Sequence, residues 1–116
     1  MEKVKEATFS YEIPYCPNCG GIVKPDIVFF GENLPRRFFQ MQQEDPDKTD
    51  LLICIGTSLE VYPFAALADF PPSNIGRILI NRHAVGSFGH RENDVILKGD
   101  LIEIIHELED NISWIK

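Results

Sequence analysis

The feature that most constrains the fold of this chain is a run of five consecutive apolar residues, Leu51–Ile55, that ends at Gly56. An apolar run this short is typical of a strand that is buried on both faces, as strands are in a parallel sheet. Arg77–Asn81, with three apolar residues at its centre, is a second predicted buried strand, and Val95–Leu97 is a candidate third. Apolar residues recur at helical spacing over 100–109. The pattern predicts an α/β protein with a parallel sheet of three or four strands.

The segments between these runs complete the expected chain path. Residues 1–15 are polar and are expected to form an arm. Ile27–Phe30 is β-branched and aromatic, which predicts a further strand. A helix is expected to open at Pro35, and a shorter one is expected over 63–69, where a proline stands at the first turn.

Composition narrows the class of protein. The chain has 116 residues, which is at most one small domain, and its formal net charge is -7. Binding to a nucleic-acid backbone needs clustered cations, whereas the longest basic cluster is Arg36-Arg37, so we expect no nucleic-acid partner. The sequence has neither an apolar run of the ~20 residues that span a bilayer nor a signal peptide at its start. We therefore expect an intracellular protein without a membrane partner.

The most specific chemical motif is Cys16-Pro17-Asn18-Cys19-Gly20-Gly21. Two thiols at this spacing favour a structural zinc over a redox pair, because the motif lies in a polar loop rather than at a strand-to-helix junction. A tetrahedral zinc takes four ligands, and only two are offered here. Cys54 lies inside an apolar run and is interpreted as a core thiol, whereas the spacing of the three histidines favours no metal site.

Two polar positions follow predicted strands. Gly56-Thr57-Ser58 comes directly after the first buried run, at the carboxyl edge of the expected sheet, where open α/β sheets bind ligands. Its hydroxyls and backbone amides can hold a phosphate or a ribose, although an ordinary strand-to-helix turn explains the segment equally well. Asn81, at the end of another strand, can bind a ribose diol or cap a turn.

Taken together, these motifs resemble one family. The chain resembles the sirtuins, the NAD-dependent protein deacylases, in four motifs. They are the cysteine motif, Lys-Pro-Asp-Ile-Val-Phe-Phe-Gly-Glu over Lys24–Glu32, Gly-Thr-Ser-Leu-x-Val-x-Pro from Gly56, and Leu-Ile-Asn-Arg ending at Arg82. The similarity runs from about residue 13 to about residue 108. It implies a partial Rossmann-like parallel sheet with half of a small zinc-ribbon subdomain: about 13–25 would be a remnant of the zinc-binding module, and 26–116 the C-terminal part of the NAD-binding domain.

The resemblance also implies residue roles. Cys16 and Cys19 match one cysteine pair of the family's structural zinc. The positions matching the wall of the acyl-lysine tunnel and the turn beside the substrate peptide are Val28, Phe29, Gly31 and Glu32. The positions matching NAD contacts are Gly56, Thr57, Ser58, Asn81, Arg82 and Leu101. His83 stands where many relatives carry Glu. The form resembles the class that contains the nuclear and cytosolic deacetylases, so a nuclear or cytoplasmic location is expected.

Other motifs of the family have no counterpart in these 116 residues. They are the other cysteine pair, the Gly-Ala-Gly-Ile-Ser phosphate loop, the Gln-Asn-x-Asp segment and the catalytic histidine. We therefore assign no catalytic residue and expect the isolated chain to be inactive, contributing an acyl-lysine wall and part of an NAD site. The alternative is a truncated, non-catalytic isoform that acts as a binding or dimerisation module, self-associating through an exposed sheet edge.

Overall fold

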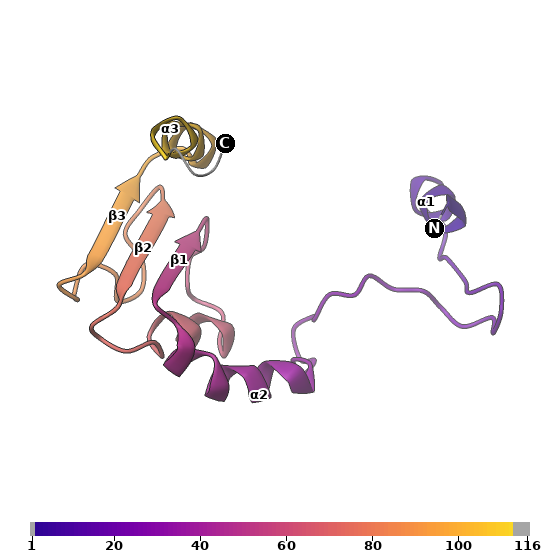
Figure 1. Ribbon diagram of the computed structural model, residues 1–116. Helices are drawn as coiled ribbons and strands as arrows, with labels where there is room; N and C mark the ends of the chain where they lie inside the picture. The colour runs from indigo at the N-terminus through magenta and orange to yellow at the C-terminus, as the bar shows by residue number, and fades with distance from the viewer. Residues whose placement is uncertain (1, 113–116) are drawn as a thin grey trace. The chain divides into compact units, whose positions relative to one another are not determined.

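The computed structural model describes residues 2–112. Contacts divide the chain into two compact units, Met1–Leu34 and Pro35–Lys116, and each is described by itself (Figure 1). This division rests on contacts alone, so the expected boundary between a zinc-binding remnant at 13–25 and an NAD-binding part at 26–116 stays a prediction. Among the described residues, no helix is long and apolar enough to cross a membrane.

The first unit contains one helix and two turns. Helix α1 spans Glu2–Phe9, within the segment expected to be an arm, because its eight residues include neither Gly nor Pro. An isolated antiparallel bridge joins Tyr15 to Ile22 and closes the cysteine motif into a loop. The strand predicted at Ile27–Phe30 is wrong: this segment is irregular. The apolar side chains favour a strand, but the backbone there turns back on itself rather than pairing in a ladder.

The second unit is built on a three-stranded parallel sheet, which confirms the predicted class. The strands are β1 (Leu51–Ile55), β2 (Gly76–Asn81) and β3 (Asp94–Lys98), in the order β1-β2-β3. Leu51 pairs with Gly76 and Arg77 with Asp94, and all the pairing is parallel (Figure 1). The carboxyl ends of the three strands therefore lie at one edge of the sheet.

Helices of this unit begin where the sequence predicts. Helix α2 spans Arg36–Glu44 directly after Pro35, and a short 3₁₀ turn, η1 (Pro46–Lys48), follows it. The segment after β1 contains a second 3₁₀ helix, η2 (Phe64–Ala68). Helix α3 spans Leu101–Asn111 after β3 and lies at the carboxyl end of the strands in Figure 1.

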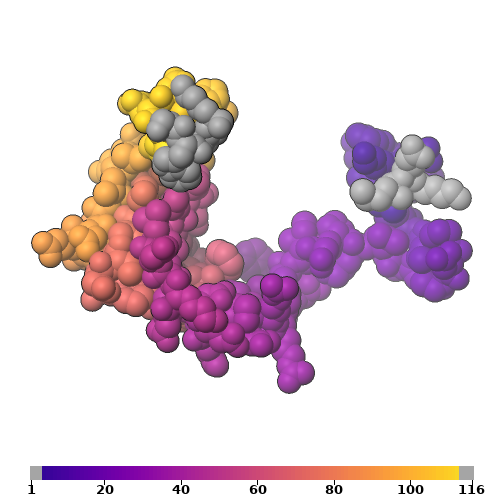
Figure 2. All heavy atoms as spheres, in the orientation of Figure 1, coloured from indigo at the N-terminus to yellow at the C-terminus, as the bar shows by residue number. Residues whose placement is uncertain are grey.

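The main cluster of buried side chains in the second unit lies on one face of the sheet, whereas Ile80 of β2 is buried on the other. Leu79 of β2 is fully buried against Ala68 of η2 and Phe88 of the β2–β3 loop. Figure 2 shows the strands and their connecting loops packed as one continuous mass, coloured magenta to orange. On the opposite face, Leu51, Ile53 and Ile55 of β1 remain 46–50% exposed. The prediction that β1 is buried on both faces is therefore wrong, because nothing in the described part of this unit covers its second face.

A single charged side chain organises the loops over this core. Arg77 of β2 is fully buried and forms a bidentate pair with Asp94 of β3, with both N···O distances 2.8 Å. Its remaining N–H groups donate to the carbonyl oxygen of Ala68, the carboxylate of Asp69, and the hydroxyl and carbonyl oxygens of Ser87. These bonds satisfy all five guanidinium donors, as a buried charge requires.

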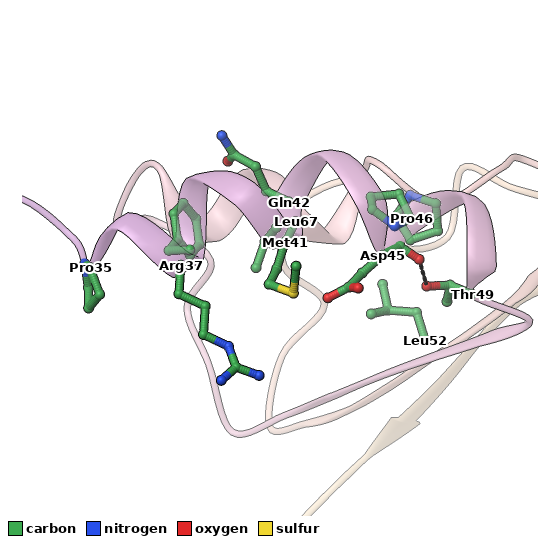
Figure 3. Close-up of a pocket in the computed structure, with 11 residues that line it drawn as sticks. Pro35, Arg37, Met41, Gln42, Asp45, Pro46, Thr49, Leu52 and Leu67 are labelled. Atoms are coloured by element: carbon green, nitrogen blue, oxygen red, sulfur yellow. Dashed lines mark hydrogen bonds between the residues drawn. The ribbon is translucent and has the colours of Figure 1, made fainter.

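Helix α2 leaves a shallow apolar groove in the second unit. The groove has a volume of about 440 Å³, and its lining includes Phe38 and Met41 of α2. Leu52 of β1 and Leu67 of η2 also line it, as Figure 3 shows. The Phe38 ring also stacks on Phe64, with centroids 6.0 Å apart. This stacking attaches α2 to η2 through aromatic side chains.

Candidate functional site

A pocket of about 530 Å³ lies at the carboxyl edge of the sheet. It is formed where each of the three strands gives way to a loop, which is the place that open α/β sheets use for ligands. Its lining contains all six residues predicted to contact NAD. The lining residues are Gly56, Thr57, Ser58, Asn81, Arg82, His83, Val85, Asp100, Leu101 and Ile102.

The loop after β1 is a compact turn that exposes a hydroxyl. Gly56 has a left-handed φ of +60°, and its N–H donates to the carbonyl oxygen of Ile80 at 3.0 Å. The Thr57 hydroxyl accepts the N–H of Leu59 at 3.1 Å, which leaves its own O–H available to a ligand. Ser58 is exposed, so its hydroxyl faces solvent at the pocket. Both hydroxyls predicted to bind a ligand line the pocket, and Ser58 is the more exposed of the two.

Asn81 links the loops that follow β1 and β2. Its amide nitrogen Nδ2 donates to the carbonyl oxygens of Thr57 at 2.9 Å and His83 at 3.0 Å. Both amide hydrogens therefore serve the protein backbone, and the oxygen Oδ1 is the atom through which Asn81 can accept a ligand hydroxyl. The two predicted roles of Asn81 are therefore compatible: its amide nitrogen caps the turn, while its amide oxygen can contact a ribose.

The start of α3 forms the third wall. Asp100 is the N-cap, and its carboxylate accepts the N–H of Ile102 at 3.0 Å. The same carboxylate lies 3.6 Å from Arg82, an exposed pair that joins this wall to the loop after β2. Leu101 packs close beneath Gly56, since a Cβ added to Gly56 would stand 2.7 Å from Leu101 Cδ1. A larger residue here would have to displace the end of the Leu101 side chain, and the left-handed φ of this position favours glycine.

Four lining residues were not among the predicted contacts: His83, Val85, Asp100 and Ile102. Asp100 carries a local signal, because an aspartate between a strand and an apolar helical stripe is a typical N-cap. Val85 and Ile102 carry none, since only the folded loops bring them to the pocket.

The cysteine pair lies in the first unit, on a tight turn. The Cys16 N–H donates to the carbonyl oxygen of Gly21 at 2.8 Å, and the Gly20 N–H donates to that of Cys16 at 2.9 Å. Backbone hydrogen bonds from Cys19 and Asn18 hold the pKa of the Cys16 thiol below its usual range. Such a turn suits two of the four positions around zinc. Residues 2–112 contain no group of three or more potential ligands, so a complete site is not formed there.

The predicted substrate segment is a second turn of the same unit. The Phe29 N–H donates to the Glu32 carboxylate at 3.1 Å, and the Glu32 N–H donates to the Phe29 carbonyl oxygen at 3.0 Å. Gly31 supplies the left-handed φ of +87° that this turn requires. The Phe29 N–H, and secondarily the Lys24 ammonium at 3.3 Å, lowers the pKa of the Glu32 carboxyl. Val28 and Phe29 are partly exposed beside these contacts.

Comparison with known proteins identifies the family. The Sir2 family model matches residues 1–63, more than half of the chain. NAD-dependent protein deacetylase hst2 of Schizosaccharomyces pombe is 40% identical over 97% of this chain. Sirtuin-3 of Mus musculus is 47% identical over 88%, and sirtuin-2 of Danio rerio is 51% identical over 74%. Both are named NAD-dependent protein deacetylases. The chain belongs to the Sir2 family, which confirms the resemblance inferred from its motifs.

The chain spans only part of the length of these relatives: 34% of the S. pombe protein, 31% of the mouse protein and 23% of the zebrafish protein.

Proposed function

We propose that this chain provides part of the NAD site and part of the acyl-lysine site of an NAD-dependent protein-lysine deacetylase. The supporting observation is the pocket at the carboxyl edge of the sheet, which gathers Gly56, Thr57, Ser58, Asn81, Arg82 and Leu101. Relatives that cover most of this chain are named for NAD dependence and deacetylation. In the complete reaction, the acyl group of acyl-lysine would pass to NAD with release of nicotinamide.

Each wall of the pocket has a distinct task in this proposal. The Ser58 hydroxyl donates to a phosphate or ribose oxygen of the dinucleotide, while Gly56 lets the loop lie close to α3. Asn81 Oδ1 accepts a ribose hydroxyl, because its nitrogen is engaged by backbone carbonyl groups. Leu101 offers an apolar surface for the adenine. Arg82 lies at the exposed rim, and its pairing with the α3 cap orients it there.

The acyl-lysine contacts are assigned to the first unit. Val28 and Phe29 would form part of the wall around the acyl-lysine side chain. The Val28 backbone would pair with the substrate peptide, which would lie as an added strand. Gly31 and Glu32 form the turn that ends this segment. No residue of the chain is assigned as the catalytic base.

Zinc is proposed as a structural metal held in part by Cys16 and Cys19. Their turn suits thiolate ligands, and the bound metal would fix the fold of the loop without taking part in the chemistry. A tetrahedral zinc takes two further ligands, and no group of three or more potential ligands is formed within residues 2–112. Free thiols used as metal ligands also fit a reducing compartment, the nucleus or the cytoplasm.

Titration with NAD, followed by amide NMR shifts, tests the cofactor proposal. Shifts are expected at the lining residues of the three loops, and Asn81→Ala should weaken the response. Asn93→Ala is the matched control, because Asn93 donates to the carbonyl oxygen of Asn74 and does not line the pocket. Equal responses of the two variants, or shifts confined to other regions, would contradict the assignment.

We further expect the 116-residue chain alone to show no NAD-dependent deacylation of an acetyl-lysine peptide, since it carries no assigned base. Detection of that activity would overturn this expectation.

A non-catalytic binding or dimerisation module is the second candidate, supported by the exposed face and free edge of β1. Light scattering distinguishes the two candidates: a self-associating module gives a dimer mass, whereas a monomer that binds NAD supports the first proposal.

A further inference from the structure

An exposed lysine makes three separate contacts with the predicted substrate segment. Lys24 Nζ donates to the carbonyl oxygen of Ile27 at 3.1 Å and to the Glu32 carboxylate at 3.3 Å. It also lies 4.8 Å from the centroid of the Phe29 ring. One ammonium group thus touches the segment before, within and after the two residues assigned to the acyl-lysine wall.

The carboxylate that receives this ammonium also holds the backbone. The same oxygen, Glu32 Oε2, accepts both Lys24 Nζ and the Phe29 N–H. The Glu32 N–H returns a hydrogen bond to the Phe29 carbonyl oxygen. The conformation of Val28–Phe29 therefore depends on the opposite charges of Lys24 and Glu32, whose hydrogen bonds reach the backbone on both sides of this segment.

We infer that Lys24 and Glu32 act as an ionic latch that positions the Val28–Phe29 segment for an acylated lysine. Neither is a catalytic residue, since they act through Phe29 and its backbone. This role rests on the proposed function, whereas the existence of the latch rests only on the contacts above. The segment needs such a device because it is irregular and has no sheet partner within residues 2–34.

The latch predicts a definite ranking of variants. Lys24→Met keeps most of the side-chain volume but removes the charge, so it should release the segment. Lys24→Arg keeps the charge and should retain much of the latch. Glu32→Gln should release the segment more strongly, because the Phe29 N–H also loses an anionic acceptor. Lys48→Met is the matched control: it removes another exposed lysine, paired with Glu44 in the second unit.

Amide hydrogen exchange measured by NMR on the 116-residue chain tests the latch itself. For an exposed ion pair, we expect exchange at Phe29 to accelerate about two- to fivefold in Lys24→Met. The Lys48 control should leave it unchanged. High salt screens the ion pair and should therefore also accelerate exchange at Phe29 in the unaltered chain. Unchanged exchange at Phe29 in both Lys24→Met and Glu32→Gln would overturn the latch.

Binding of an acetyl-lysine peptide, followed by fluorescence anisotropy, tests the positioning role. Weaker binding in Lys24→Met with recovery in Lys24→Arg supports it. Faster exchange at Phe29 combined with unchanged peptide affinity would overturn positioning while leaving the latch in place. If the unaltered chain binds no peptide, the proposed acyl-lysine site fails and the positioning role fails with it. The latch is then judged by exchange alone.

Discussion

Replacing Asp94 with asparagine should destabilise the second unit severely. One oxygen of this carboxylate accepts Arg77 Nε, and the other accepts Arg77 Nη2 together with the N–H groups of Gly89 and Arg91. Asparagine has a single oxygen, so whichever way its amide is turned, an NH₂ group faces a donor. The substitution also leaves the fully buried Arg77 charge without its principal partner.

The magnitude follows from the burial of the pair. Breaking a buried ion pair by removing one charge costs about 3–5 kcal/mol. A folded unit the size of Pro35–Lys116 has a free energy of unfolding of roughly 4–12 kcal/mol, so the loss is a large fraction of the total. Asp69→Asn is the matched control: Asp69 also contacts Arg77, but half of its side chain is exposed, and the expected cost is within about 1 kcal/mol.

Urea unfolding followed by circular dichroism measures this difference, and pH provides a second readout. The hydrogen bonds from Arg77 hold the pKa of Asp94 well below its usual range. Because the pKa of Asp94 is lower in the folded chain than in the unfolded chain (~3.9), its ionised carboxylate stabilises the fold at any pH above about 3.9. This stabilisation is lost as the pH falls from the unfolded pKa through the folded pKa. The unaltered chain should therefore lose stability steeply below about pH 4, and Asp94→Asn should flatten that dependence. A variant within about 1 kcal/mol of the unaltered chain at neutral pH would refute the reasoning.

Three further outcomes are expected. Gly56→Ala should impair both folding and NAD binding, because its methyl group would stand 2.7 Å from Leu101 and alanine is strained at φ +60°. The urea midpoint measures the effect on folding, and an NAD titration measures the effect on binding. Asp100→Ala should cost about 0.5–2 kcal/mol by removing the cap of α3, measured by thermal unfolding, and an unchanged Tm would contradict the role of the cap. Cys16→Ser should lower zinc content measured by atomic emission, whereas Cys54→Ser should not; equal zinc in both variants would exclude the proposed ligands.

The strands and helices of the second unit were predictable because local patterns and packing agree there. The apolar run before Gly56 becomes β1, the proline at 35 precedes α2, and the aspartate at 100 caps α3. Ile27–Phe30 shows the opposite case: its residues favour a strand, but a strand needs a partner ladder, and the backbone instead bonds within a turn closed by Glu32. The residue composition of a segment does not tell whether another strand lies beside it to complete the ladder.

The candidate site divides in the same way. The predicted NAD contacts follow strands in the sequence, and parallel pairing brings the carboxyl ends of strands to one edge, so their meeting at one pocket was expected. The polar core was not predicted. Arg77 looks like the exposed first residue of a strand, but it is fully buried because Asp94 stands beside it in the register of β2 and β3.

The sequence by itself determined the class of fold, the order of the elements in the second unit and the family, since these depend on apolar periodicity and on short motifs with fixed spacing. The tertiary structure alone decided which atoms face the pocket and which are committed to the backbone. The Thr57 hydroxyl accepts the N–H of Leu59 and keeps its own hydrogen for a ligand, whereas Asn81 offers its oxygen because two carbonyl groups take its nitrogen. The physical reason is that hydrogen-bond partners are assigned by distance in the folded chain, and the carbonyl oxygen of Thr57 meets Asn81 across 24 residues of sequence.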